Sequence, residues 1–283
     1  MRNNQTRLGH VPGSPAAQPA AQFASQDAAP QPLYSVPTEF VRLPSKGKFY
    51  PQDHPLFEKQ EIEIKYMTAK EEDLLASEEL FRNGLLVERL IESLIVDKRI
   101  NPRTLLVGDR NAIMIASRVS AYGANYTASV PCTECGKVTE EFEFNLKKGV
   151  INTKFTDAKY LSKHNLTFDE ENRIFVLTLP NSQITVGFRM MTGQDFDTFD
   201  DVHPNSTVTQ TLSKLIVSVQ GSFDREQVRS FVEHMPASDS KFLRKLYVEI
   251  IPSIDLKQEF QCAHCGFVSM KEVPLDAGFF WPE

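Results

Sequence analysis

The sequence has little cysteine, and what it has is confined to two short stretches. Only four of its 283 residues are cysteine, and they form two Cys-x-x-Cys-Gly motifs that begin at Cys132 and Cys262. Hydrophobic runs are also short, since none approaches the roughly 20 residues that a membrane helix requires. No apolar signal-peptide core follows the first arginines. We therefore expect no membrane segment and a reducing cytoplasm, where paired cysteines more often hold metal than form disulfides.

Positive charge is scarce as well. Lysine and arginine total 31 against 37 aspartate and glutamate residues, which gives a formal net charge of −6. This balance argues against a general phosphate-binding surface, so nucleic acid is not an expected partner. The common enzyme motifs are missing too: there is no Walker loop, GxSxG, HExxH or GxGxxG. We therefore predict no catalytic residues and no enzymatic activity.

The first 36 residues contain few large apolar side chains. A stretch such as "GSPAAQPAAQFASQDAAPQP" is rich in alanine, proline and glutamine. It cannot bury enough surface to offset the entropy lost on ordering. We expect residues 1–36 to form a flexible tail, either with a docking role or without a specific one.

The rest of the chain contains two halves that resemble each other. The segment "EIEIKYMTAKEEDLL" at 61–75 is echoed by "SQITVGFRMMTGQDFDTF" at 182–199. In each, an alternating strand reaches Met-Thr, and an acidic residue follows the threonine at capping-box spacing. Farther on, "RLIESL" matches "KLIVSV", Asp109 matches Asp239, and the cysteine pairs repeat at an offset of 130 residues. Because the matches keep one order, we interpret them as a duplication.

The repeated unit is predicted to mix strands and helices. Apolar stripes predict helices near 85–99 and 105–120 in the first copy. The second copy has corresponding stripes, Leu212 to Val219 and Phe242 to Ile250. Each copy ends in a hairpin around its Cys-x-x-Cys-Gly motif. The predicted fold class is therefore α+β, with two pseudo-symmetric duplicated lobes: residues 37–149 form the first, and residues 150–283 form a linker and the second.

The two cysteine motifs are typical of zinc knuckles. Each offers two thiolates, half of a tetrahedral structural zinc site, and the glycine after the second cysteine permits a positive φ. We predict one zinc site that joins the two lobes, with four ligands: Cys132, Cys135, Cys262 and Cys265. Four thiolates leave no open position for substrate, so catalysis at the metal is not expected.

Other interpretations of the cysteines stay open at this level. The hairpins can carry reduced, uncoordinated thiols, or one pair can be a redox dithiol, although neither lies in a thioredoxin-like βαβ pattern. His264, between Cys262 and Cys265, can replace a cysteine as ligand. Zinc can also be shared between chains in a homo-oligomer.

Three aromatic residues stand near the C-terminus of the sequence. Phe279, Phe280 and the single tryptophan, Trp281, follow one another. Exposed aromatic side chains reduce solubility, so the segment either folds back beside the hairpins or anchors a partner, a use for which Trp and Phe are well suited. We predict these three residues as partner-binding.

With these motifs in view, the chain resembles the T-even-type bacteriophage baseplate hub assembly proteins. The likeness covers roughly residues 38–283 and lies in "LPSKGKFY", "KYMTAKEEDLL", "LLVGDRNAIMIASRVSAYG", "VPCTECGKV" and the "CAHCG…PLDAGFFWP" ending. The resemblance implies a non-enzymatic structural or assembly protein, a chaperone or adaptor, that contacts hub or spike proteins. Its setting would be the host bacterial cytoplasm during assembly, and the virion baseplate if it is retained.

Two other functions compete with this one. A zinc-ribbon nucleic-acid-binding or regulatory factor would use the knuckles, but few basic residues flank them: Lys137 and Lys271. A zinc enzyme would need three protein ligands and a water at the metal. Salt-sensitive DNA binding would favour the former, and fewer than four protected thiols per zinc would favour the latter.

Overall fold

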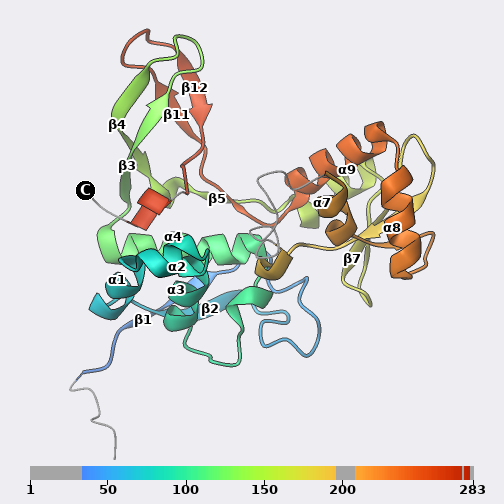
Figure 1. The fold of residues 1–283 in the computed structure, drawn as a ribbon, viewed down its shortest axis with the longest axis horizontal. Helices are drawn as coiled ribbons and strands as arrows, with labels where there is room; N and C mark the ends of the chain where they lie inside the picture. Colours follow the sequence, from blue (N-terminus) through green and yellow to red (C-terminus); the bar gives the residue numbers. More distant parts are fainter. Residues whose placement is uncertain (1–33, 196–207, 276, 281–283) are drawn as a thin grey trace, which may run out of the picture. The chain divides into compact units, whose positions relative to one another are not determined.

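A computed structural model of the protein describes residues 34–195, 208–275 and 277–280. By their contacts, residues 1–35 and residues 36–283 form separate units, and every element described below belongs to the second. Helices and strands are mixed along the chain, so the fold is α+β as predicted (Figure 1). Most of the predicted tail, residues 1–33, lies outside the described residues.

The first half of this unit joins a strand pair, a group of helices and a long hairpin. The antiparallel pair β1–β2 precedes α1, α2 and α3, and the 16-residue α4 leads into the antiparallel hairpin β3–β4. The bounds are β1 Thr38–Arg42, β2 Glu61–Lys65, α1 Ala69–Leu75, α2 Glu78–Arg82, α3 Leu86–Leu94, α4 Val107–Tyr122, β3 Asn125–Pro131 and β4 Val138–Asn145.

The second half is built on a four-stranded antiparallel sheet with the order β6-β7-β8-β9. Helices α7, α8 and α9 accompany this sheet, and the short hairpin β11–β12 ends the half. The bounds are β5 Val150–Ile151, α5 Ala158–Lys163, β6 Thr167–Asp169, β7 Ile174–Thr178, β8 Thr185–Phe188, α7 Val208–Leu215, β9 Ile216–Val219, α8 Arg225–His234, α9 Ala237–Ile250, β10 Ile254–Asp255, β11 Gln258–Gln261 and β12 Val268–Lys271.

The predicted helix starts after the two Met-Thr pairs are present. The carboxylate of Glu71 accepts hydrogen bonds from the amide (2.9 Å) and the hydroxyl (2.6 Å) of Thr68. Asp195 accepts the same two bonds from Thr192, at 2.7 and 3.1 Å. An acidic side chain three residues into a helix thus satisfies backbone N–H groups that would otherwise lack partners.

Two predicted helical stretches end earlier than expected. The helix near 85–99 stops at Leu94, because Ile95 turns extended and forms an antiparallel bridge with Ile64 of β2. In the second half the helix stops at Leu215, and the following Ile216 pairs with Phe188 of β8. The predicted match of "RLIESL" with "KLIVSV" is therefore wrong in detail. β-branched residues favour the strand once a sheet edge is within reach.

A buried aspartate holds the turn after β1. Asp109, in the first turn of α4, is fully buried and accepts hydrogen bonds from the amide of Ser45 (3.0 Å) and the hydroxyl of Tyr50 (2.9 Å). Asp239, also fully buried and in the first turn of α9, accepts from the amides of Asn181 (2.9 Å) and Ser182 (2.8 Å). Both turns follow a Leu-Pro pair at the end of a strand. Each helix is thus tied to the strand pair of its own half.

The burial of Asp109 predicts a pH-dependent stability. Burial raises the pKa of Asp109 to about 6, although hydrogen bonds from Ser45 and Tyr50 lower it. The folded pKa lies above that of an unfolded aspartate, so this contribution is complete below about pH 4 and is lost as the pH rises through about 6. We expect this group to lower the free energy of unfolding by about 2 kcal/mol between pH 4 and pH 7. Urea denaturation at both pH values should show this drop in the wild type but not in Asp109→Asn; equal pH profiles would contradict it.

Several contacts join the two halves. The amide of Gly193 donates to the carbonyl of Leu105 (2.9 Å), and the amide of Val107 donates to the carbonyl of Met191 (3.3 Å). Leu106, just before α4, forms an antiparallel bridge with Thr192. The buried apolar side chains of both halves belong to one contiguous cluster. The halves therefore share a core rather than meeting only at the cysteines.

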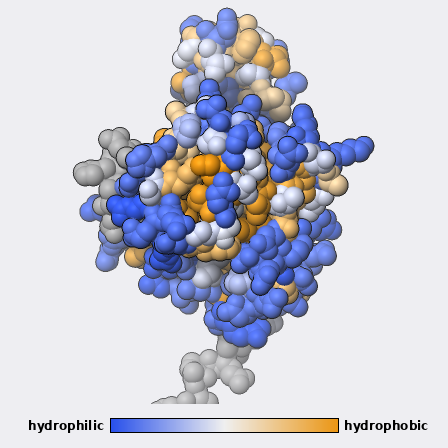
Figure 2. Space-filling model, turned by 90° about the vertical axis from the view of Figure 1, so that its right-hand side faces the viewer, coloured by the Kyte–Doolittle hydropathy of each residue, from blue (hydrophilic) through white to orange (hydrophobic). Residues whose placement is uncertain are grey.

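One side of the molecule is largely hydrophilic. Figure 2 shows a side of the molecule on which hydrophilic residues surround a central hydrophobic patch. Among the helices that the structure describes, none has the length and apolar character needed to cross a lipid bilayer.

Candidate metal centre

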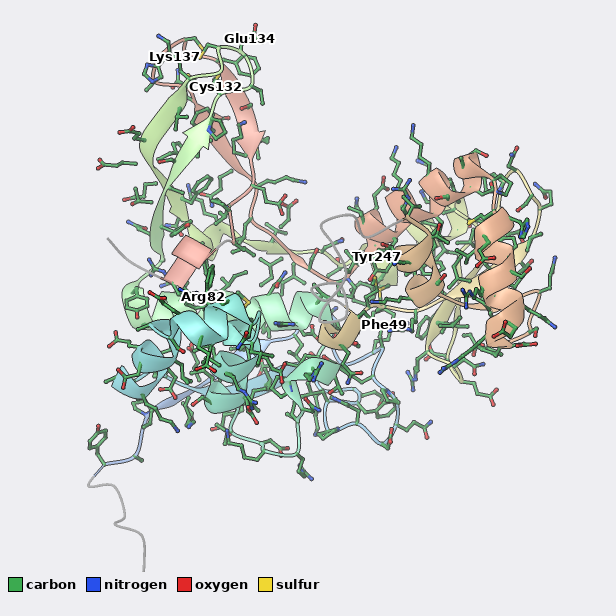
Figure 3. All side chains as sticks on the ribbon, in the orientation of Figure 1. Phe49, Arg82, Cys132, Glu134, Lys137 and Tyr247 are labelled. Atoms are coloured by element: carbon green, nitrogen blue, oxygen red, sulfur yellow. The ribbon has the colours of Figure 1, made fainter. Side chains whose placement is uncertain are left out.

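Each Cys-x-x-Cys-Gly motif forms a tight turn between two antiparallel strands. In the β3–β4 hairpin, the amide of Cys132 donates to the carbonyl of Lys137 (2.9 Å), and the amide of Gly136 donates back to the carbonyl of Cys132 (3.1 Å). In the β11–β12 hairpin, the same two bonds join Cys262 to Phe267 and Gly266 to Cys262, both at 2.9 Å. The two turns therefore have one geometry. Figure 3 shows Cys132 beside Glu134 and Lys137 at the end of the hairpins.

Glycine is required in these turns by the backbone angle rather than by space. Gly136 has φ 71° and Gly266 has φ 73°, in the left-handed region that other residues seldom adopt. A Cβ added at either position would meet no atom within 4 Å. In these turns the amides of Glu134 and His264 donate to the Sγ atoms of Cys132 and Cys262, both at 3.4 Å.

The two hairpins pack against each other along their length. Near the base, the amide of Asn145 donates to the side chain of Gln258, which donates back to the carbonyl of Asn145, both at 3.0 Å. Midway, the rings of Phe142 and Phe260 meet edge to face with centroids 5.1 Å apart. These contacts hold the hairpins in register, so their tips come together.

The four predicted ligands lie in one cluster at these tips. Their sulfurs are all within 4.8 Å of one another, and the Sγ atoms of Cys132 and Cys265 and of Cys135 and Cys262 are each 3.7 Å apart. None is in a disulfide. A regular tetrahedron with Zn–S bonds of about 2.3 Å has sulfurs about 3.8 Å apart. The cluster therefore has the size that a tetrahedral metal ion needs, and the four thiols can hold one.

Backbone amides around the cluster favour thiolate at the two buried cysteines. Hydrogen bonding from the amide of Cys135 lowers the pKa of Cys132, and burial offsets this only in part. Burial raises the pKa of Cys262, but the amides of His264 and Cys265, with the neighbouring thiols, outweigh it and lower the pKa to about 6. Thiolate is the form that binds metal. The turns thus supply amide donors that suit anionic sulfur.

Four sulfurs this close cannot all ionise without a positive charge among them. At Cys265 the amide of Phe267 lowers the pKa, but burial and hydrogen bonding to the three other thiols outweigh it and raise the pKa to about 12. The protons of such a cluster are shared, because each thiolate disfavours the next. A divalent cation would replace these protons, and with four protein ligands it would serve as a structural cross-link.

His264 is not among the clustered ligands. Its Nε2 lies 3.0 Å from the carbonyl oxygen of Val138 on the facing hairpin. Its backbone amide instead points at the Sγ of Cys262, at 3.4 Å. The histidine thus links the hairpins from outside the sulfur cluster, and the alternative in which it replaces a cysteine has no support in this geometry.

Comparison with known proteins assigns the chain to a protein family. A family model described as T4 bacteriophage base plate protein matches residues 36–281, most of the chain. The chain belongs to this family. No curated protein and no solved structure matches it. The resemblance inferred from the motifs is thereby confirmed at the level of a T4-type baseplate protein, and membership supports a structural or assembly role in a phage baseplate.

The C-terminal aromatic residues of this baseplate protein lie differently from the prediction. Phe279 is 0% and Phe280 4% exposed, and the ring of Phe279 meets that of Tyr126 edge to face at 5.2 Å. Side chains this buried offer no surface to a partner, so the partner-binding prediction for the two phenylalanines is corrected. They fold back, which was the other alternative. Trp281 lies outside the described residues.

Two features that position the site in this baseplate protein have no sequence signal. The Asn145–Gln258 pair links residues 113 positions apart. The guanidinium of Arg118, buried in α4, donates from Nε to the carbonyl of Phe279 (2.9 Å), 161 positions away. No spacing rule marks a lone polar residue whose partner is so distant. The sequence indicates only that each half ends in a similar hairpin, and so that the two hairpins can lie together.

Proposed function

We propose that this protein is a non-enzymatic structural or assembly component of a contractile-tail baseplate hub, a chaperone or adaptor that acts through protein–protein contacts. The observation that carries this proposal is the baseplate family match over residues 36–281. Its partners would be other hub or spike proteins, met in the host cytoplasm during assembly, with retention in the virion as a possible end state. The formal net charge of −6 argues against the nucleic-acid-binding alternative.

We further propose that the four cysteines bind one zinc ion. The tetrahedral spacing of the sulfurs and the amides directed at them support zinc, which is commonly held by four thiolates in structural sites. Bound there, the ion would stabilise all four thiolates and cross-link the hairpins. The chain's own contribution is the paired turns, the aromatic contact of Phe142 with Phe260 and the Asn145–Gln258 pair, which hold the ligands in place.

We also propose that the two halves arose by duplication of one unit. In the first half Arg42 stands opposite Glu61, and in the second Thr178 stands opposite Thr185. In each case the next residues along the chain are Leu-Pro. The Leu-Pro turns bound by Asp109 and Asp239, the Thr-acid helix caps and the knuckles then follow in the same order. This shared order supports two copies of one unit, with boundaries near residues 37–149 and 150–283.

The zinc proposal can be tested by metal content and native mass together. One zinc per chain in a monomer, with four thiols protected from a thiol reagent until a chelator is added, is the expected result. Zinc present only in oligomers, at half an ion per chain, would favour sharing between chains. Three protected thiols per zinc would contradict a closed structural site.

The assembly role requires a binding experiment with defined partners. We expect the full chain to co-purify with at least one hub or spike protein of the same phage when the two are co-expressed pairwise. A panel of such proteins that all fail to bind would contradict the proposal. Deleting residues 279–283 would not isolate a partner contact, because the deletion removes Phe279 and Phe280 from the core.

A further inference from the structure

Three positively charged side chains lie on the exposed face of α9. Lys241, Arg244 and Lys245 are exposed at helical spacing and lead to Val248, which is 70% exposed. No ion pair joins these three cations to any described residue. Residues three or four apart on a helix lie on one face. The helix therefore presents a basic stripe of about 10 Å, from Lys241 to the valine.

Other surface helices of the protein neutralise their own charge. An arginine and a glutamate are paired within one turn in α2, where Arg82 contacts Glu78 at 2.7 Å. The same holds in α3, where Arg89 contacts Glu92 at 2.8 Å, and in α8, where Arg229 contacts Glu233 at 3.2 Å. Such pairs are the common arrangement on a solvated helix. On α9 the Glu249 carboxyl, whose pKa is lowered by the hydrogen bond from Tyr160 and also by the charge of Lys245, forms no ion pair with that lysine among the described residues. The charge of Lys241 and Arg244, and part of that of Lys245, is therefore available to another surface.

A surface of negative charge lies on the β3–β4 hairpin. Three glutamates of β4 are exposed and form no ion pair with any described residue: Glu140, Glu141 and Glu143. The same strand begins with Val138, which is 45% exposed. At about 3.3 Å per residue, the three glutamates span about 10 Å, and at about 1.5 Å per residue the three cations of α9 span about 6 Å. Strand and helix thus each present three like charges and one exposed valine.

We propose that the basic face of α9 in one copy binds the acidic face of β4 in a second copy of this chain. No ion pair joins the two faces within the chain, among the described residues, so each is available to a second copy. Association buries Val248 and Val138 beside the charged groups and adds apolar contact. Because the two faces differ, the contact is head-to-tail, and successive copies form a ring or an open chain.

The electrostatic origin of the contact determines how it responds to salt. Exposed charge pairs are screened as the Debye length falls from about 10 Å at 0.1 M to about 3 Å at 1 M. We therefore expect sedimentation velocity over a concentration series to show self-association of the full-length, metal-loaded protein. The association constant should fall at least ~10-fold across that salt range. A protein that is monomeric throughout the series overturns the proposal.

Charge reversal provides the decisive test. The triple variant Lys241→Glu/Arg244→Glu/Lys245→Glu and the triple variant Glu140→Lys/Glu141→Lys/Glu143→Lys should each lose self-association. Mixing the two variants should restore it, because each then meets the opposite charge on the other. Restoration also shows that both variants are folded. Failure to restore association in variants with native circular dichroism and wild-type metal content overturns the proposal.

A matched control separates this surface from charge in general. The swap Arg229→Glu/Glu233→Arg on α8 alters charged positions of another exposed helix and leaves the local pair intact. It should self-associate like the wild type. If it weakens association as much as the reversals do, the contact does not lie on α9 and the inference is wrong. If neither triple variant weakens association, the copies meet through another surface.

Discussion

Replacing Cys262 by alanine is expected to abolish metal binding and to unfold the paired hairpins. The side chain is buried and is one of four clustered thiols. At the proposed zinc site its loss would leave three ligands and would remove the metal cross-link between β3–β4 and β11–β12. Metal binding contributes about 10–16 kcal/mol to the folding of isolated zinc fingers, so a short hairpin such as β11–β12 should not remain folded without it. Metal analysis should fall from one zinc per chain to none.

Amide hydrogen exchange identifies the elements that unfold in Cys262→Ala. We expect amides of β3–β4 and β11–β12 to lose protection, while those of α4 and of the β6–β9 sheet keep theirs, because that core is built from apolar contacts. Thr133→Ala is the control, since Thr133 lies exposed in the facing turn, between Cys132 and Cys135, and is not a ligand. Full protection of both hairpins in Cys262→Ala would show that the metal is not what holds them.

Replacing Asp109 by alanine is expected to lower the free energy of unfolding by roughly 3–5 kcal/mol. The change removes a buried carboxylate and leaves the amide of Ser45 and the hydroxyl of Tyr50 without their acceptor. Both donors are enclosed, so water cannot replace the carboxylate without rearrangement. Urea denaturation at pH 7 measures the effect, and the loop between β1 and β2 should be the first region to lose amide protection.

Asp73→Ala is the control for this prediction. Asp73 is an exposed aspartate of α1, one turn beyond the helix start, and forms no side-chain hydrogen bond within the described residues. Its loss should cost no more than the ~0.3–1 kcal/mol of a helix-terminus charge. If the two changes lowered the free energy of unfolding equally, the contribution of Asp109 to stability would not come from its burial and its hydrogen bonds to the turn.

The predictions that held were those that depended on local pattern. The Thr68 and Thr192 caps follow from three-residue spacing, and the knuckle turns follow from a glycine just after a Cys-x-x-Cys pair. Predictions that depended on a choice between helix and strand failed near Ile95 and Ile216. There the apolar period is compatible with either element, and the neighbouring strand decides.

The candidate site was predictable in its residues but not in its supports. Four cysteines in two matched motifs pointed to one cluster, and the sulfurs do lie together. Asn145, Gln258 and Arg118 could not be found, because each acts on a group more than 100 positions away. The aromatic tail was ambiguous for the same reason: the pocket that covers Phe279 is formed by residues such as Tyr126, far from it in the chain.

The sequence by itself determined the two knuckles, the acidic caps, the mixed helix and strand content and the baseplate family, since each depends on residues close together in the chain. Only the tertiary structure decided that the hairpins pair along their length, that Phe279 and Phe280 are core, and that α9 and β4 leave opposite charges exposed. These outcomes depend on which surfaces exclude water from one another, and local spacing carries no information about that.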